Sequence, residues 1–142
     1  MKKLFLIAVI GLGAALGASA TEWEFFSLSF IPGVPSDAET RTVCGIKVGV
    51  PISTGVAPVY GVEAGVFWAG TDDVAGIQCS LIGTMSKAVA GLQFALLNIT
   101  DRMAGLQLGI VNIAEEQSFQ LGLVNVIKNS PLPFFPIINF RF

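Results

Sequence analysis

Histidine is absent from the 142-residue chain, and its absence narrows the chemistry that the protein can perform. Histidine is the commonest general base and a frequent zinc ligand, so the usual catalytic triads and most zinc sites are excluded. Charge is also scarce, because only 13% of the residues are Asp, Glu, Lys or Arg. The adjacent carboxylates Asp72 and Asp73 lie in a predicted turn and indicate a solvated loop tip. We therefore expect no enzymatic activity, no catalytic residue, no cofactor and no metal site.

The chain has only two cysteines, Cys44 and Cys79. In an exported protein, which the N-terminus described below predicts, a pair of cysteines can form a disulfide. The repeat of the chain places the two residues two units apart, which corresponds to about twice the ~4.8 Å spacing of strands. A disulfide needs Cα atoms within about 7 Å of each other. Both residues fall on the predicted apolar face, where a free thiol behaves as a small apolar side chain. We predict two free cysteines.

Long apolar runs are missing after the first 20 residues, so none approaches the ~20 residues of a membrane helix. The N-terminus begins Met1-Lys-Lys, continues as an apolar run from Leu4 to Leu16 and reaches the small residues Ala18-Ser-Ala20. This pattern predicts a secretory signal peptide, residues 1–20. We expect residues 21–142 to form a single β-repeat domain. Their ten acidic and six basic residues give a net charge of −4, which argues against a nucleic-acid partner.

The chain is rich in a short repeat. Its clearest copies are Gly91-Leu-Gln-Phe-Ala-Leu-Leu-Asn98, Gly105-Leu-Gln-Leu-Gly-Ile-Val-Asn112 and Phe119-Gln-Leu-Gly-Leu-Val-Asn125. The glutamines at positions 78, 93, 107 and 120 are 15, 14 and 13 residues apart. Alignment on this position gives eight units, the last with Phe134 in the Gln place and Asn139 five residues later. So short a period means that each unit is one strand or one coil.

Each unit alternates with the period of two that is typical of a strand. One face is apolar, as in Leu92 and Phe94, whereas the other carries a polar residue followed two positions later by a small one. We expect these polar residues to form a structural ring or ladder: Ser27, Lys47, Glu63, Gln78, Gln93, Gln107 and Gln120. Lys47 and Glu63 stand at this place in neighbouring units, so we predict a buried ion pair between them.

Eight strand-length segments fill the domain: 23–32, 42–52, 58–69, 74–83, 88–99, 103–113, 117–127 and 133–142. Each has about the 9–11 residues of a transmembrane strand, and eight is the smallest common strand number of an outer-membrane barrel. The closing Ile138-Asn-Phe-Arg-Phe142 resembles the C-terminal signal of bacterial outer-membrane β-barrel proteins. Together with the low charge, these features favour an all-β fold, an eight-stranded antiparallel up-and-down transmembrane β-barrel.

A parallel β-solenoid of about eight short coils is the alternative. It would stack Gln on Gln and Asn on Asn, whereas an antiparallel meander gives these residues no reason to match. Four apolar residues fall on the polar face of a continuous strand: Val111, Ile113, Val124 and Val126. A corner after Gly109 or Gly122 would turn them into the core of a solenoid. Gln93 and Gln107 distinguish the two folds, because they pair in parallel and in register only in the solenoid.

The Gly-Leu-Gln-x-x-x-x-Asn units resemble a bacterial surface-repeat family known from spirochaete surface proteins. The resemblance covers residues 76–142 well and the first half weakly, since Ser27, Lys47 and Glu63 there replace the glutamine. It implies a surface location and supplies no activity and no functional residues.

These patterns predict an exported, non-enzymatic bacterial protein of the outer membrane or cell surface. Its expected role is structural or surface-interacting, with membrane lipid as a partner. The alternative function is that of a soluble or surface-attached β-solenoid that serves as a binding scaffold. The sequence identifies neither a ligand nor a protein partner.

Overall fold

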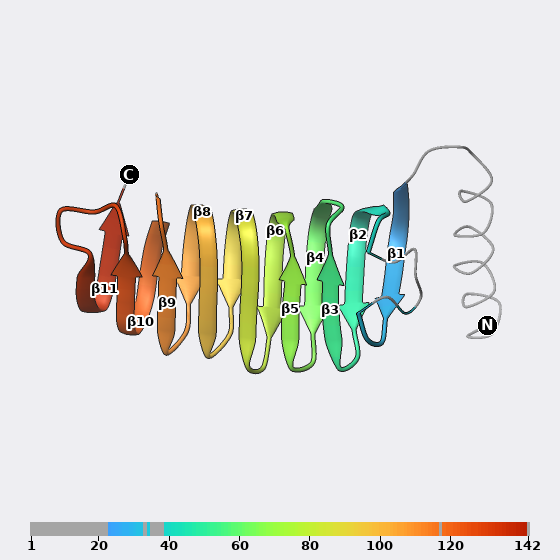
Figure 1. Ribbon diagram of the computed structural model, residues 1–142, viewed down its shortest axis with the longest axis horizontal. Coiled ribbons are helices and arrows are strands. Elements are labelled where there is room, and N and C mark those ends of the chain that lie inside the picture. Colours follow the sequence, from blue (N-terminus) through green and yellow to red (C-terminus); the bar gives the residue numbers. More distant parts are fainter. Residues whose placement is uncertain (1–22, 33, 35–38, 117, 142) are drawn as a thin grey trace, which may run out of the picture.

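The computed structural model describes residues 23–32, 34, 39–116 and 118–141, which fold as a parallel β-solenoid (Figure 1). Its strands are β1 (Trp23–Ser29), β2 (Thr42–Gly49), β3 (Ile52–Gly55), β4 (Val59–Gly65), β5 (Trp68–Thr71), β6 (Asp73–Ser80), β7 (Gly83–Phe94), β8 (Leu97–Leu108), β9 (Val111–Ala114), β10 (Ser118–Ile127) and β11 (Phe134–Arg141). The predicted signal peptide, residues 1–20, lies outside the described residues, and so does Phe142.

Each coil of the solenoid has a long side and a short side, joined by two bends. Strands β1, β2, β4 and β6 lie on the long side, and β3, β5 and β9 lie on the short side. Strands β7 and β8 run from the short side round a bend to the long side, whereas β10 runs from the long side to the short side. The chain thus rises by one strand spacing per coil, about 4.8 Å.

The pairing of neighbouring coils shows that the predicted antiparallel barrel is wrong and that the alternative, the solenoid, is right. Strands pair in parallel from β1 to β10, and equal positions of the repeat lie side by side. Gln93 pairs with Gln107, and Gln107 pairs with Gln120. Only a parallel, in-register array places like on like, which is why a repeat with matched Gln and Asn positions specifies it.

The segments predicted as single strands are broken by a corner. In the predicted strand 58–69, β4 ends at Gly65 and β5 begins at Trp68. A Cβ atom on Gly65 would lie 1.8 Å from the carbonyl oxygen of Trp68, so the corner closes only around a glycine. The residues that follow each corner are apolar. The hydrophobic pattern therefore continues through the bend and predicts a single strand where the structure has two.

The corner also changes which residues face inward. In the coil that contains Gly109, the buried residues after the corner are Asn112 and Ala114. The four apolar residues expected to turn into the core instead point outward and are half-buried: Val111, Ile113, Val124 and Val126. The alternation of inward and outward residues therefore shifts at the corner, as the solenoid hypothesis supposed. The shift brings asparagine into the interior in place of valine and isoleucine.

Strand β11 closes the C-terminal end of the solenoid. It pairs antiparallel with β10, so that Asn139 lies beside Gln120. Phe134, which the repeat alignment placed in the Gln row, is exposed at the start of this strand. The chain reverses between Ile127 and Phe134, through a segment with two prolines. The prediction that the last unit repeats the others is therefore wrong, and this unit is a cap.

A row of glycines with positive φ runs along the long side. Gly91 has φ of 139°, a conformation that residues with a Cβ atom rarely adopt. A Cβ atom there would lie 2.0 Å from the carbonyl oxygen of Gly76 on the preceding coil. The glycines of the repeat thus allow successive coils to approach to one strand spacing.

We predict that Gly91→Ala lowers the free energy of unfolding by at least about 1–3 kcal/mol, because it combines backbone strain with a clash. Gly70→Ala is the matched control, since Gly70 is not among the glycines with positive φ and its Cβ atom would come no closer than 3.3 Å to another atom. Chemical denaturation followed by circular dichroism measures both variants. Equal stability of the two would contradict the close glycine stacking.

Candidate functional site

The interior of the solenoid is polar. The residues expected to form a ring or ladder all point inward and are at most 3% exposed: Ser27, Lys47, Glu63, Gln78, Gln93, Gln107 and Gln120. They lie in one row along the long side, in register from coil to coil. A small apolar cluster of Val43, Val59, Val74, Val89, Met103 and Ala114 is the interior's main non-polar part.

The four glutamines form a continuous hydrogen-bonded ladder. The Nε2 atom of Gln120 donates to Oε1 of Gln107 at 2.7 Å, and Gln107 donates to Gln93 at 2.8 Å. Gln93 donates to Gln78 at 2.8 Å, and Gln78 donates to Oε2 of Glu63 at 2.7 Å. All amides therefore point in the same direction, toward the N-terminal end.

Glu63 sets the direction of this ladder. An ionised carboxylate only accepts hydrogen bonds, so Gln78 must turn its amide nitrogen toward it. The same orientation is then passed from one glutamine to the next. At the other end, Oε1 of Gln120 has no hydrogen-bond partner among the described residues, as expected for the last acceptor of a one-way chain.

Asparagines form a second ladder, on the short side and in the opposite direction. Nδ2 of Asn98 donates to Oδ1 of Asn112, and Asn112 donates to Asn125, both at 2.8 Å. The same nitrogens reach corner carbonyl groups, since Asn98 contacts the oxygen of Leu108 and Asn112 that of Leu121, both at 2.9 Å. The asparagines five residues after Gln93 and Gln107 thus give a second hydrogen bond to corner carbonyl groups that already accept one from the backbone N–H of Ala95 or Gly109.

A row of hydroxyl side chains across the interior was not found from the sequence. Ser86 exchanges hydrogen bonds with Gln78, and Oγ1 of Thr100 donates to Gln93 at 2.6 Å. Ser53 and Thr71 both donate to Oε1 of Glu63 at 2.6 Å. Thr71, Ser86 and Thr100 follow the polar residue of their own unit, Glu63, Gln78 or Gln93, by seven or eight residues. That spacing is the signal that could have identified them from the sequence, whereas Ser53 does not share it.

Lys47 and Glu63 are joined through Thr71, which corrects the predicted direct ion pair. Nζ of Lys47 donates to Oγ1 of Thr71 at 3.1 Å and to the backbone oxygen of Thr54 at 2.6 Å, while Thr71 donates to Glu63. The lysine fits because Gly55 lies opposite, where a Cβ atom would be 2.3 Å from Nζ. Burial lowers the pKa of Lys47 below its ordinary value, and the nearby Glu63 carboxylate only partly offsets this.

Both cysteines are free, as predicted. Cys44 is exposed and Cys79 is half-buried, and they lie on β2 and β6, with β4 between them. Burial, with a smaller contribution from Glu63, raises the pKa of Cys79. Neither thiol belongs to a candidate reactive site.

The exterior, by contrast, is largely apolar. The bend from the long side to the short side carries exposed apolar side chains in every coil, and we call it the apolar edge: Val50, Val66, Phe67, Leu81, Ile82, Leu96, Ile110 and Leu123. Further exposed apolar residues lie on the outer face of the long side, among them Ile77, Leu92 and Phe94. Bends are normally rich in Gly, Asn and Asp, so an edge of leucine and isoleucine is unusual.

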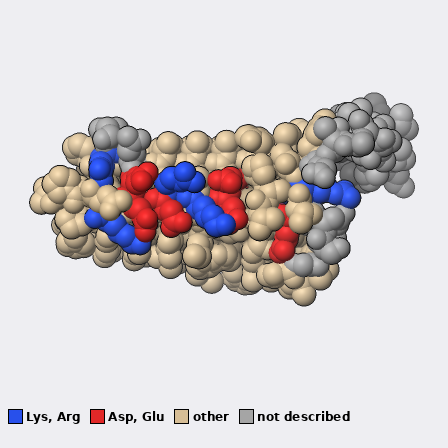
Figure 2. All heavy atoms as spheres, turned by 45° about the horizontal axis from the view of Figure 1, so that its top comes forward, with Lys and Arg blue, Asp and Glu red and all other residues tan. Residues whose placement is uncertain are grey.

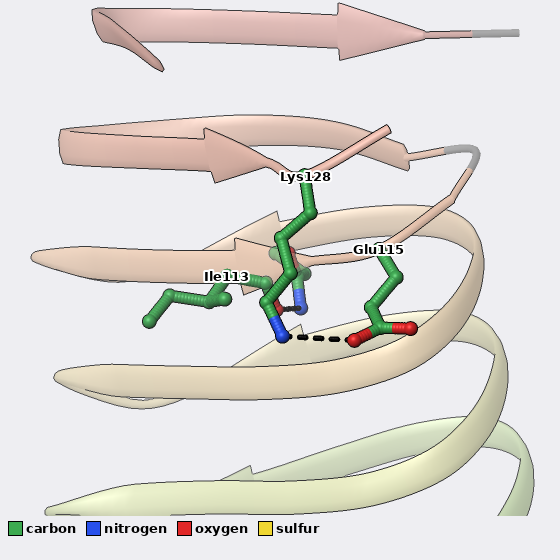
Figure 3. Close-up of polar contacts among 4 residues, drawn as sticks. Ile113, Glu115 and Lys128 are labelled. Atoms are coloured by element: carbon green, nitrogen blue, oxygen red, sulfur yellow. Dashed lines mark hydrogen bonds and ion pairs between the residues drawn. The ribbon is translucent and has the colours of Figure 1, made fainter. Parts of the chain in front are cut away.

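The opposite bend carries the charge, and we call it the charged edge: Asp72, Asp73, Lys87, Asp101, Arg102, Glu115, Glu116 and Lys128. Figure 2 shows its acidic and basic residues as a band along the length of the solenoid. Lys87 contacts Asp72, and Lys128 contacts Glu115, each at 2.8 Å and each between neighbouring coils. Figure 3 shows the contact between Lys128 and Glu115. The predicted solvated tip is confirmed only for Asp73, which is exposed, because Asp72 is half-buried and ion-paired with Lys87.

The candidate site is the outer surface of the solenoid, with its apolar edge and its charged edge. Within residues 23–32, 34, 39–116 and 118–141, no three His, Cys, Asp or Glu side chains come together as metal ligands. The same part of the chain has no helix long and apolar enough to span a membrane. What the structure offers chemically is an ordered polar interior and two contrasting edges.

Comparisons with models of protein families, with characterised proteins and with solved structures find no match for this chain.

We predict that Glu63→Ala lowers the free energy of unfolding by about 3–5 kcal/mol, because it removes the carboxylate that offsets the buried charge of Lys47 and leaves Ser53, Thr71 and Gln78 without their acceptor. Adding Lys47→Met should recover part of this loss, since the double variant has no uncompensated buried charge. Denaturant titration of the two single variants and the double variant forms a complete cycle. Strict additivity of the two effects would contradict the coupling through Thr71.

The lowered pKa of Lys47 predicts a pH dependence of stability. Between its folded pKa and the ordinary value of 10.5, the unfolded chain binds a proton that the folded chain lacks, so stability rises with pH. Lys87 and Lys128 have raised pKa values and titrate above this window. We expect Lys47→Met to remove this rise, on the alkaline side and below pH 10.5, in urea titrations. A Lys47→Met variant with an unchanged slope would show that another group causes it.

Proposed function

We propose that this protein is an exported, non-enzymatic β-solenoid that acts as a binding scaffold at the cell surface. The observation that carries the proposal is the reversed polarity of the coil. Its hydrogen-bonding side chains are directed inward and bonded to one another, whereas leucine, isoleucine and phenylalanine are exposed on the outside. An exposed apolar surface of this extent marks an interaction site in a folded protein.

The interior supports a scaffold rather than a reaction centre. The Lys47–Thr71–Glu63 contact and the amide ladders are sealed inside the coil, where a substrate could not reach them. Their role is to hold the coils in register, so that each coil presents its apolar edge at the same place. A rigid array of equal units with one continuous binding surface is how solenoid proteins generally bind.

The surface location rests on sequence features. Residues 1–20 have the pattern of a signal peptide, and the Gly-Leu-Gln-x-x-x-x-Asn units resemble repeats of spirochaete surface proteins. The low charge of the chain also fits a protein that works against another surface instead of moving freely in water.

Export and surface exposure are testable in the cells that make the protein. We expect the mature N-terminus to be Thr21, and a membrane-impermeant amine reagent to label Lys87 and Lys128 on intact cells, because both lysines are exposed. Deletion of residues 2–20 is the control and should abolish labelling of intact cells while leaving it unchanged in lysates. An unprocessed chain that is labelled only after lysis would overturn the surface role.

A further inference from the structure

We propose that the apolar edge is seated in one leaflet of a lipid bilayer, with the charged edge left in water. This inference rests on the proposed function and names the partner class of the same surface. It starts from the contrast between the two bends of each coil. One bend exposes apolar side chains alone, and the other carries the charged residues of the coil.

Charge is excluded from the rest of the exterior. Apart from the charged edge, the described charged residues are Lys47 and Glu63, which lie inside, and four residues at strand ends near that edge: Glu24, Glu39, Arg41 and Arg141. The outer faces and the apolar edge therefore carry no ionic group within the described part of the chain. A surface with one ionic edge and three apolar sides matches a lipid–water boundary.

The distance between the two edges fits a single leaflet. In successive coils a residue of the apolar edge is followed five residues later by a residue of the charged edge: Phe67 and Asp72, Ile82 and Lys87, Leu96 and Asp101, Ile110 and Glu115, Leu123 and Lys128. Five steps of about 3.3 Å along a strand span about 16 Å. One leaflet contributes about 15 Å of the ~30 Å hydrocarbon core. The coil is therefore deep enough to fill one leaflet, and spanning both would bury the charged edge.

The backbone of the solenoid is suited to lipid. A membrane-embedded chain must satisfy its N–H and C=O groups internally, and the parallel pairing of successive coils does this along the whole side wall. The corner carbonyls of Leu108 and Leu121 accept hydrogen bonds from the backbone N–H groups of Ala95 and Gly109, and each accepts a second one from the side chain of Asn98 or Asn112. The polar ladders provide cohesion that does not depend on water.

A second copy of the chain explains the surface less well than lipid. A symmetric dimer covers one patch on each subunit. Exposed apolar residues occupy the long side at Ile77 and Leu92, the short side at Met85 and the apolar edge at Leu81 and Leu96. One dimer contact would leave at least one of these sides in water, whereas a leaflet covers all of them together.

Flotation of the purified protein with phosphatidylcholine vesicles on a density gradient tests the proposal. We expect the protein to float with these neutral vesicles, and high salt to leave the bound fraction unchanged, because the charged edge has five acidic and three basic residues and offers no cationic patch. Binding that requires anionic phosphatidylglycerol, or that salt abolishes, would overturn seating by the apolar edge.

Matched leucine variants locate the contact. Leu81 and Leu132 are both 65% exposed, but Leu81 lies on the apolar edge and Leu132 in the loop that leaves β10 beside the charged edge. We expect Leu81→Gln to weaken vesicle partition about tenfold, and the triple variant with Leu96→Gln and Leu123→Gln to weaken it at least about a hundredfold. Leu132→Gln should stay within about twofold of the parent. All sites are exposed, so circular dichroism should show the fold retained.

An environment-sensitive fluorophore on a single cysteine reports the orientation. In a Cys44→Ser, Cys79→Ser background, the label at Leu81→Cys should shift to the blue when vesicles are added, and the label at Lys87→Cys should not. Equal shifts at both sites, or no shift at either, would overturn the orientation. A soluble oligomer that protects the label at position 81 and does not float would assign the apolar edge to a second copy. Failure of flotation with surface labelling of intact cells retained would reject the lipid and leave the scaffold function standing.

Discussion

In-register stacking of amide side chains is the constraint on which the rest of this structure depends. A glutamine or asparagine amide carries a donor and an acceptor, so identical amides one strand spacing apart can form an uninterrupted chain of hydrogen bonds. This requires parallel strands, equal positions side by side and coils one strand apart. The glycines of the long side allow that approach, and the corner asparagines add a side-chain hydrogen bond to carbonyl groups that already pair with backbone N–H groups.

The ladders also explain why a charge pair lies at the head of the Gln row. Glu63 accepts from Gln78, Ser53 and Thr71, and in this way orients every amide behind it. Lys47 continues the row on the preceding coil, held by Thr71 and the carbonyl of Thr54. In a low-dielectric interior such a network is strong when complete and costly when one member is missing. These residues therefore hold the coils together from within, which is the part that they play in the proposed scaffold.

The polarity of the coil is reversed relative to most soluble folds. Apolar burial normally drives folding in water, yet here the buried apolar residues are few, and apart from Met103 and Ile127 they are valines and alanines, whereas most of the large apolar residues are exposed. A fold held by internal hydrogen bonds with an apolar surround has the distribution that a lipid environment favours. The constant five-residue step between the apolar edge and the charged edge keeps the two edges equally far apart in successive coils.

Periodicity alone determined a good part of this protein. The all-β fold, the repeat and the membership of the polar row follow from alternation and spacing, because a period of two separates the faces of any strand. The free cysteines follow from the distance of two units between them. The direction of the strands did not follow, because parallel and antiparallel strands show the same alternation. The corners, and with them the outward position of Val111 and Ile113, did not follow either, because the apolar pattern continues through each bend. Those features were decided by tertiary contacts: parallel amide stacking, the carbonyl groups at the glycine corners, and the hydroxyl of Thr71 between Lys47 and Glu63.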